Sequence, residues 1–302
     1  MERGEAVVGG NRHGGPVTEL GICFVPTMPP ARLRSLATAA ESAGLDELWV
    51  WEDCFKESAV ASAAAALAWT DRITVGISLM PTPLRNAALC AMELANLAGM
   101  FPGRLIAGLG HGVQEWIGQA GARVASPLTL LEEYVTAVRR LLVGERVRVE
   151  GRYVQLDDVA LDWPPATPPP LMLGGKGPKS LAQAARLGDG VLLGAALTDH
   201  EIRETCELIA QHRGRPGHPV QVPLIAATGP GAQARVDAEV PRWSRPTDLG
   251  IGAAGDAEAI AGVIRRLASI GVTSVTIQPT EDEPDLEGFV GFLGRDVRPL
   301  VR

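Results

Sequence analysis

The chain has 302 residues, with 28 lysines and arginines against 35 aspartates and glutamates, and its formal net charge is −7. This acidic balance argues against nucleic acid or an anionic membrane as the main partner. The length suits one large barrel domain. The four cysteines are scattered, with no CxxC pair and no clustering with histidine, which predicts free thiols in a reducing interior and no zinc site.

The longest apolar run, residues 59–69, is mostly alanine and too short to cross a bilayer. Residues 1–18 are rich in glycine and charge and lack the apolar core of a signal peptide, so we expect a disordered tail there. We therefore expect a soluble, cytoplasmic protein with one domain over residues 19–302. The alanine-rich stretch is compatible with a homodimer, and the sequence leaves the oligomeric state open.

Short apolar strands alternate with amphipathic helices through the first half of the chain. A helix that begins at Pro127, behind Ser126 as its cap, has its leucines and valines on one side. Before it we expect strands at residues 20–26, 47–53, 73–80 and 104–107, and helices at residues 32–44, 58–69 and 86–98. Alternation with short connections is typical of right-handed βαβ units and a parallel sheet.

Residues 144–170 interrupt this rhythm with an expected β-hairpin and a stiff, proline-rich connector, WPPATPPP. Residues 229–255 read as a long loop rich in glycine and proline. The alternation otherwise resumes, with strands expected at 171–174, 190–197, 220–227 and 274–278 and helices at 178–187, 201–212 and 257–269. Eight strand-and-helix units favour a closed (β/α)8 barrel over an open sheet, with the hairpin inserted between the fourth helix and the fifth strand.

The first candidate site is the stretch GRLIAGLGHGVQEW, residues 103–116. Gly108, Gly110 and Gly112 occupy alternate positions after the fourth expected strand, and His111 lies between the last two. Glycines at a strand's exit let the backbone take positive φ and approach a flat ligand closely. The dinucleotide fingerprint GxGxxG is excluded, because its third glycine is replaced by Val113. A tight turn alone needs fewer glycines and no histidine, so we interpret this stretch as part of a ligand site.

The second candidate site is LMLGGKGPKS, residues 171–180. Gly174 and Gly175 close a strand, Lys176 and Gly177 follow, and Pro178 opens a helix whose free N–H groups point back at the loop. This combination of glycines, positive charge and a helix start suits a phosphate group. The alternative is an ordinary loop with solvated lysines.

The second expected strand ends in acidic residues. A carboxylate such as Asp53, at the carboxyl end of a barrel strand, can bind a ligand or exchange protons. The alternative is that Asp53 caps the next segment. Glu115 and Trp116, just after the first glycine motif, either contact a substrate or begin a helix, and we favour the helix.

With GLGHG, GGKGPK and eight barrel units, the chain resembles the bacterial luciferase-like monooxygenase superfamily. The closer resemblance is to its branch related to methylenetetrahydromethanopterin reductase and other deazaflavin-dependent oxidoreductases. It covers residues 20–278 and implies a TIM-like barrel that binds FMN or coenzyme F420 at the carboxyl ends of its strands. By position, Ser78 and Leu79 match a cis non-proline peptide beside the cofactor ring in relatives. Residues 108–112 match the segment that lines the ring, and residues 174–178 match the phosphate-binding loop.

One position departs from the family pattern. Many relatives carry a histidine directly after the second-strand acid, where this chain has Cys54. The sugar-phosphate dehydrogenase and luciferase mechanisms are therefore in doubt.

The leading hypothesis is an oxidoreductase that uses F420 or FMN for hydride transfer or monooxygenation on a small organic substrate. His111 would contact the ring or donate a proton, Asp53 would orient ring or substrate, and residues 229–255 and the hairpin would cover the pocket. A phosphate-binding aldolase or isomerase is disfavoured because no expected strand contains a lysine. A non-catalytic flavin-binding barrel is the third interpretation. The sequence decides neither the substrate nor the choice between the two cofactors.

Overall fold

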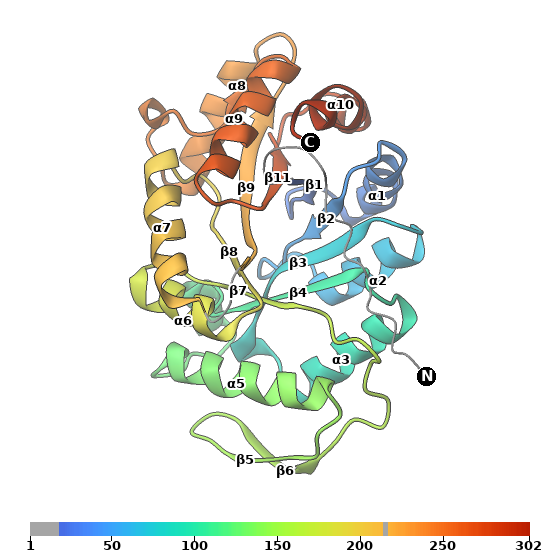
Figure 1. The fold of residues 1–302 in the computed structure, drawn as a ribbon, viewed down its shortest axis with the longest axis vertical. Helices are drawn as coiled ribbons and strands as arrows, with labels where there is room; N and C mark the ends of the chain where they lie inside the picture. The colour runs from blue at the N-terminus through green and yellow to red at the C-terminus, as the bar shows by residue number, and fades with distance from the viewer. Residues whose placement is uncertain (1–17, 214–216) are drawn as a thin grey trace, which may run out of the picture.

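The computed structural model describes residues 18–213 and 217–302, so the expected tail, apart from Thr18, lies outside the described residues. Eight parallel strands close into a barrel surrounded by helices (Figure 1). Each strand pairs with the next in the order β1-β2-β3-β4-β7-β8-β9-β11, and β11 pairs back with β1. The expected (β/α)8 barrel is thereby confirmed.

The barrel strands agree with the expected segments to within a few residues. They are β1 (Glu19–Phe24), β2 (Glu47–Val50), β3 (Thr74–Pro81), β4 (Leu105–Gly110), β7 (Leu171–Gly174), β8 (Gly190–Leu192), β9 (Val220–Ala227) and β11 (Ser274–Pro279). The largest differences are in β4, which continues through two of the motif's glycines, and in β8, which ends five residues earlier than expected.

Several of the surrounding helices begin after a residue whose side chain accepts a backbone N–H. Ser58, Asn86, Ser126, Thr198 and Asp256 cap in this way, which replaces a hydrogen bond that the first turn lacks. The helices are α1 (Leu33–Ser42), α2 (Ala59–Ala68), α3 (Ala87–Met100), α4 (Gln114–Gln119), α5 (Pro127–Leu142), α6 (Pro178–Leu187), α7 (Asp199–His212) and α9 (Ala257–Ser269).

The apolar core has two layers. The larger cluster packs the outer faces of the strands against the helices, and a smaller one fills the barrel itself with Cys23, Val25, Trp49, Trp51, Met172 and Leu192. The Trp49 indole fits because its neighbour on β3 is Gly76, where a Cβ would lie 2.4 Å from the ring. Trp49 Nε1 donates to Glu47 Oε2 at 2.7 Å, and Ser274 Oγ donates to the same oxygen at 2.6 Å. The middle of the barrel is therefore packed solid, as barrels of eight strands are.

The expectation of a long loop over residues 229–255 is wrong. This segment contains α8 (Ala232–Glu239) and a short strand, β10 (Ala253–Ala254), which extends the sheet beside β9. Gly231 turns into α8 with a φ of 72°, and Val236 packs in a small apolar cluster with Ile225 of β9. The flanking glycines and prolines predicted a loop, although six of the eight residues of α8 are good helix formers (Ala, Gln, Arg and Glu). A further helix, α10 (Leu286–Phe292), follows the last strand and was not anticipated.

The expected hairpin is present as β5 (Val147–Glu150) and β6 (Gln155–Val159), which form a separate antiparallel pair outside α5 (Figure 1). The carboxylate of Glu133 on α5 accepts the backbone N–H groups of Arg152, Tyr153 and Val154 at 2.8–3.0 Å. These bonds tie the hairpin turn to the outer side of α5.

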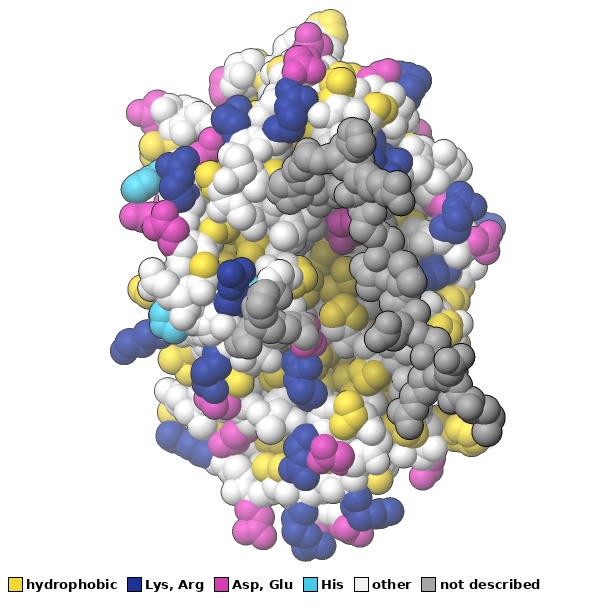
Figure 2. Space-filling model, viewed as in Figure 1, with side chains coloured by type: hydrophobic (Ala, Val, Ile, Leu, Met, Phe, Trp, Pro, Cys, Tyr) yellow, Lys and Arg dark blue, Asp and Glu magenta, His cyan; other side chains and the backbone are white. Residues whose placement is uncertain are grey.

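The surface and the cysteines agree with the composition. Figure 2 shows acidic and basic side chains interspersed over the viewed face. All four cysteines are free thiols, as predicted. No helix among residues 18–213 and 217–302 has the length and apolar character needed to cross a membrane.

Candidate functional site

A cavity of about 640 Å³ lies at the carboxyl ends of the barrel strands. Its wall includes His111 and Gly112 after β4, and Gly174, Gly175 and Lys176 at the end of β7. The two glycine motifs, with 61 residues between Gly112 and Gly174, therefore open into one space. Parallel strands place their carboxyl ends at one face of a barrel, which is where barrel enzymes hold their sites.

His111 forms part of this wall with an incompletely bonded ring. Both ring nitrogens are buried, and neither makes a hydrogen bond of normal geometry to any described residue. Burial lowers the pKa of His111, and the Pro127 carbonyl opposes that shift. The imidazole is therefore held neutral near pH 7, with one donor and one acceptor for a ligand to satisfy.

Two carboxylates follow β2, and they have different surroundings. Glu52 accepts Arg85 Nη2 at 2.9 Å and the backbone N–H of Ala59 at 2.9 Å, while Arg85 also pairs with Glu93 at 3.2 Å. For Asp53, burial raises the pKa and the charge of Lys56 opposes the shift. Glu52 is thus neutralised by its partner, whereas Asp53 presents to the cavity a carboxyl that is prone to carry a proton.

Three tryptophans line the cavity: Trp51, Trp116 and Trp243. Trp51 and Trp243 meet edge to face, with ring centroids 5.7 Å apart and an interplanar angle of 80°. Trp243 belongs to the 229–255 segment, which therefore borders the cavity as expected. The hairpin does not, since none of its described residues lines the cavity. That expectation was wrong because the hairpin is bound to the outer side of α5.

The opposite motif combines a tight turn with a helix start. Gly177 adopts a φ of 79° directly before Pro178, the first residue of α6. A Cβ at Gly175 would lie 2.6 Å from Ser180 Cβ, so glycine is needed for the turn to close against the helix. Lys176 is exposed and lines the cavity. A lysine beside the unbonded N–H groups of a helix start is a favourable place for a phosphate.

Most of the residues singled out from the sequence line this cavity: Asp53, Ser78, Leu79, His111, Gly112, Gly174, Gly175 and Lys176. The Ser78–Leu79 peptide is cis, as the family resemblance implies, and Cys54–Phe55 is cis as well. Gly177 and Pro178 are exposed and are not among the residues that line the cavity.

Gly108 and Gly110 are not on the wall either. A Cβ at Gly108 would lie 2.0 Å from the Ile77 carbonyl oxygen, and one at Gly110 would lie 2.6 Å from the Leu79 side chain. Glycine at these two positions lets a neighbouring strand and a side chain pack against the backbone. Of the three glycines, only Gly112 has a positive φ, at 67°.

Several wall residues were not predicted from the sequence. Pro127 and Leu128 reach the cavity from the start of α5, residues 192–195 from the end of β8, and Trp243 from the 229–255 segment. A lone tryptophan in a segment rich in glycine and proline was a usable signal. The others carry no local mark, because only closure of the barrel brings them to the site.

The amino-acid sequence is similar to a known protein family and to several characterised enzymes. A family model described as luciferase-like monooxygenase matches residues 6–278. The 5,10-methylenetetrahydromethanopterin reductase of Methanolobus tindarius is 33% identical over 177 residues, which cover 58% of this chain and 54% of the reductase. An F420-dependent glucose-6-phosphate dehydrogenase of Kineococcus radiotolerans is 33% identical over 196 residues, covering 60% and 57%. The chain thus spans about half the length of the curated relatives it matches.

Solved structures agree over almost the whole chain. An F420-dependent secondary alcohol dehydrogenase, in complex with an F420-acetone adduct, superimposes with a TM-score of 0.83 at 21% identity, covering 94% of this chain and 99% of that one. The coenzyme F420-dependent tetrahydromethanopterin reductase of Methanopyrus kandleri gives 0.83 at 19%, with the same coverage. A type II Baeyer-Villiger monooxygenase of Pseudomonas putida, in complex with FMN, gives 0.76 at 17%, covering 94% and 98%. At these identities the likeness establishes the fold.

Proposed function

The chain belongs to the luciferase-like monooxygenase family, and from that premise we propose that it is an oxidoreductase that uses coenzyme F420 or FMN to transform a small organic substrate. One observation carries this proposal. The histidine-bearing turn after β4 and the lysine-bearing turn after β7 both open into one cavity at the carboxyl end of the barrel. Both F420 and FMN have a ring system joined to a phosphate, so either cofactor needs one contact for the ring and one for the phosphate.

The residues present fit such a cofactor. The unbonded nitrogens of His111 suit the polar edge of a flavin or deazaflavin ring, and Lys176 with the start of α6 suits its phosphate. When bound, either cofactor would supply the two-electron chemistry that no protein side chain provides. Of the two we propose F420, because F420-dependent enzymes recur among both the curated relatives and the solved structures reported above.

The protein's own contribution follows from the geometry. His111, held neutral by burial, hydrogen-bonds the ring. Asp53, whose pKa burial raises, is placed to exchange a proton with the substrate. The Glu52–Arg85 pair fixes the backbone next to Asp53 through the N–H of Ala59. The three tryptophans keep water from the reacting groups.

The direct test is to titrate the purified protein separately with F420 and FMN and follow cofactor fluorescence. We expect binding of at least one cofactor. Loss of a charged hydrogen-bond partner at an exposed position should raise Kd about fivefold in Lys176→Ala. Lys179→Ala is the matched control, since Lys179 does not line the cavity and should matter less. His111→Ala should also weaken binding. The proposal fails if neither cofactor binds, or if Lys176→Ala and His111→Ala both bind as tightly as the unchanged protein.

A further inference from the structure

The cavity offers its substrate an aromatic and apolar surface. Trp51, Trp116 and Trp243 line it, and Val113, Leu128 and Pro223 contribute further apolar surface. Trp51 and Trp243 come from opposite ends of the chain's sequence and pack edge to face, which fixes both rings. Fixed indole rings favour an apolar, flat or cyclic ligand over a flexible polar one.

The charges at the cavity are few, and most are already paired. The described lining residues that carry charge are Glu52, Asp53 and Lys176. Glu52 is held by Arg85, and Arg85 is shared with Glu93, so this network presents no free positive charge. Lys176 lies at the α6 turn that we assign to the cofactor phosphate. Among the described wall residues, no other cation is available for a second anionic group.

Hydrogen-bond donors, in contrast, are available. Trp243 Nε1 is buried without a partner in the part of the chain that the structure describes. Burial also raises the pKa of Asp53, so its carboxyl binds a proton more readily than that of an exposed aspartate. An indole N–H can only donate. The matching group on a ligand is therefore an oxygen that accepts, such as a carbonyl or hydroxyl.

From this arrangement we propose that the substrate part of the cavity takes an uncharged, largely apolar ring compound bearing one acceptor oxygen, which Trp243 binds. The inference rests on the proposed function, because it assigns Lys176 to the cofactor. A phosphorylated sugar fits poorly: its dianion would lie beside Asp53 with no cation to pair with, and burying an unpaired charge is costly. This chain would thus differ in substrate from the relatives named as glucose-6-phosphate dehydrogenases.

The test compares three probes on the purified protein, with and without saturating F420, by ligand-observed NMR. Cyclohexanone represents the proposed class. Cyclohexanecarboxylate is its charged counterpart, and glucose 6-phosphate represents the sugar phosphates. We expect cyclohexanone to bind at least about tenfold more tightly than either anion. Tighter or equal binding of either anion, or no binding of cyclohexanone, would overturn the proposal.

Three variants assign the binding to Trp243. Trp243→Ala should weaken cyclohexanone binding about tenfold, and Trp243→Phe, which keeps a ring but loses the N–H, about threefold. Trp163→Ala is the matched control, because Trp163 is 88% exposed on the connector after the hairpin and should leave Kd unchanged. An unchanged cyclohexanone Kd in Trp243→Ala would contradict the inference. The cofactor Kd, measured on the same samples, distinguishes this result from failure of the proposed function, in which neither cofactor would bind.

Discussion

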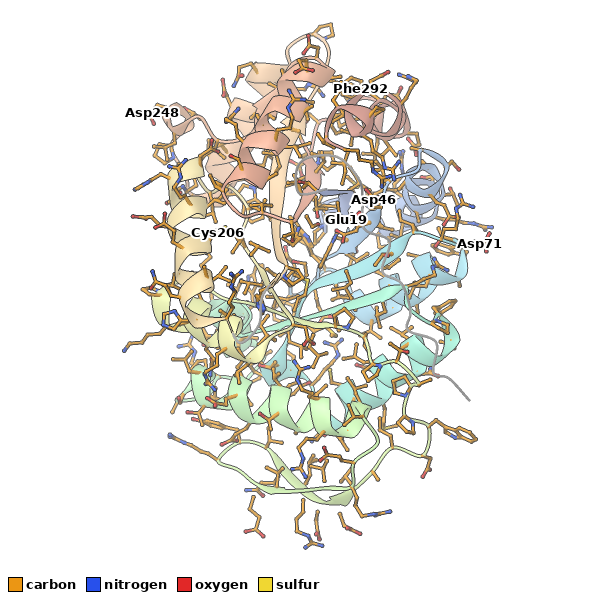
Figure 3. All side chains as sticks on the ribbon, in the orientation of Figure 1. Glu19, Asp46, Asp71, Cys206, Asp248 and Phe292 are labelled. Atoms are coloured by element: carbon orange, nitrogen blue, oxygen red, sulfur yellow. The ribbon has the colours of Figure 1, made fainter. Side chains whose placement is uncertain are left out.

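The two ends of the barrel hold cavities of similar size but opposite character. The amino-terminal cavity, of about 690 Å³, is lined by Glu19, Glu41, Asp46 and Glu47 among others. Glu19 and Asp46 lie close together there (Figure 3). Asp46 accepts Arg298 Nη2 at 2.8 Å and the backbone N–H of Leu20 at 3.1 Å. At the carboxyl end, the nitrogens of His111 and Trp243 have no such partners among the described residues.

This contrast teaches that volume alone does not locate function in this fold. Polar groups at the amino-terminal end hold the structure together: Glu41, for example, accepts the backbone N–H groups of Asp71, Arg72 and Ile73 at 2.6–3.0 Å. At the other end, the side-chain nitrogens of His111 and Trp243 are left for a ligand. We therefore expect substitutions at the amino-terminal end to change mainly stability, and substitutions at the carboxyl end to change mainly ligand binding and turnover.

The largest effect should come from Asp53→Asn at the carboxyl end. A proton-donating carboxyl contributes roughly 10²- to 10⁴-fold to turnover, so we expect kcat to fall at least about 100-fold. Burial raises the pKa of Asp53, and a proton donor is active below its pKa. The activity of the unchanged protein should therefore decline as pH rises through that raised pKa, and the variant should lack this decline.

Steady-state rates across pH with the preferred substrate measure this prediction. Asp157→Asn is the control, since Asp157 lies on the hairpin and its side chain is 83% exposed. Unchanged kcat and an unchanged pH profile in Asp53→Asn would remove Asp53 from the chemistry.

The next effect should be on stability, from Glu47 at the amino-terminal end. Glu47→Ala leaves the Trp49 N–H and the Ser274 hydroxyl buried without their acceptor, which should lower the free energy of unfolding by about 2–4 kcal/mol. Glu47→Gln keeps an acceptor and should cost much less. Urea denaturation measures both, and cofactor Kd should not change in Glu47→Gln. Equal stability of Glu47→Ala and the unchanged protein would refute the structural role.

Glu47 also predicts a pH dependence with a definite sign. Burial raises its pKa in the folded protein. Its contribution to stability is therefore complete below the ordinary glutamate pKa and is lost as pH rises through the folded-state pKa. In Glu47→Gln this part of the pH dependence of unfolding should disappear. A steeper loss in the variant would show the opposite sign and contradict the assignment.

The smallest effect should come from Arg302→Ala, beside Asp46. The Arg302 side chain is 43% exposed, and Asp46 retains Arg298. An exposed ion pair contributes at most about 1 kcal/mol, and salt screens it. We expect a small loss of stability that shrinks in high salt, measured by thermal unfolding, with kcat unchanged. A marked change in kcat would show that the two ends are coupled, which would break the contrast drawn above.

The sequence predicted the barrel well because its signals are local. Caps such as Ser126 and Asp256, apolar faces spaced for helices, and short apolar strands all act within a few residues of each other. The meeting of the two glycine motifs also followed, because parallel strands share one carboxyl end. The packing roles of Gly108 and Gly110 could not be predicted, because the atoms that a Cβ would meet there belong to other strands that are distant in sequence. Trp243 reaches the cavity through a tertiary contact with Trp51, which no short window of sequence contains.

The Trp49 indole, buried in the barrel against Gly76, determines how ligands can enter and leave the cavity. The indole blocks the axis of the barrel, so the cavity at the carboxyl end is closed at its base and does not connect to the amino-terminal end. A ligand that enters this cavity must therefore leave through the same opening. The cofactor that we propose would narrow this opening further, so substrate and product would have to pass through it one after the other.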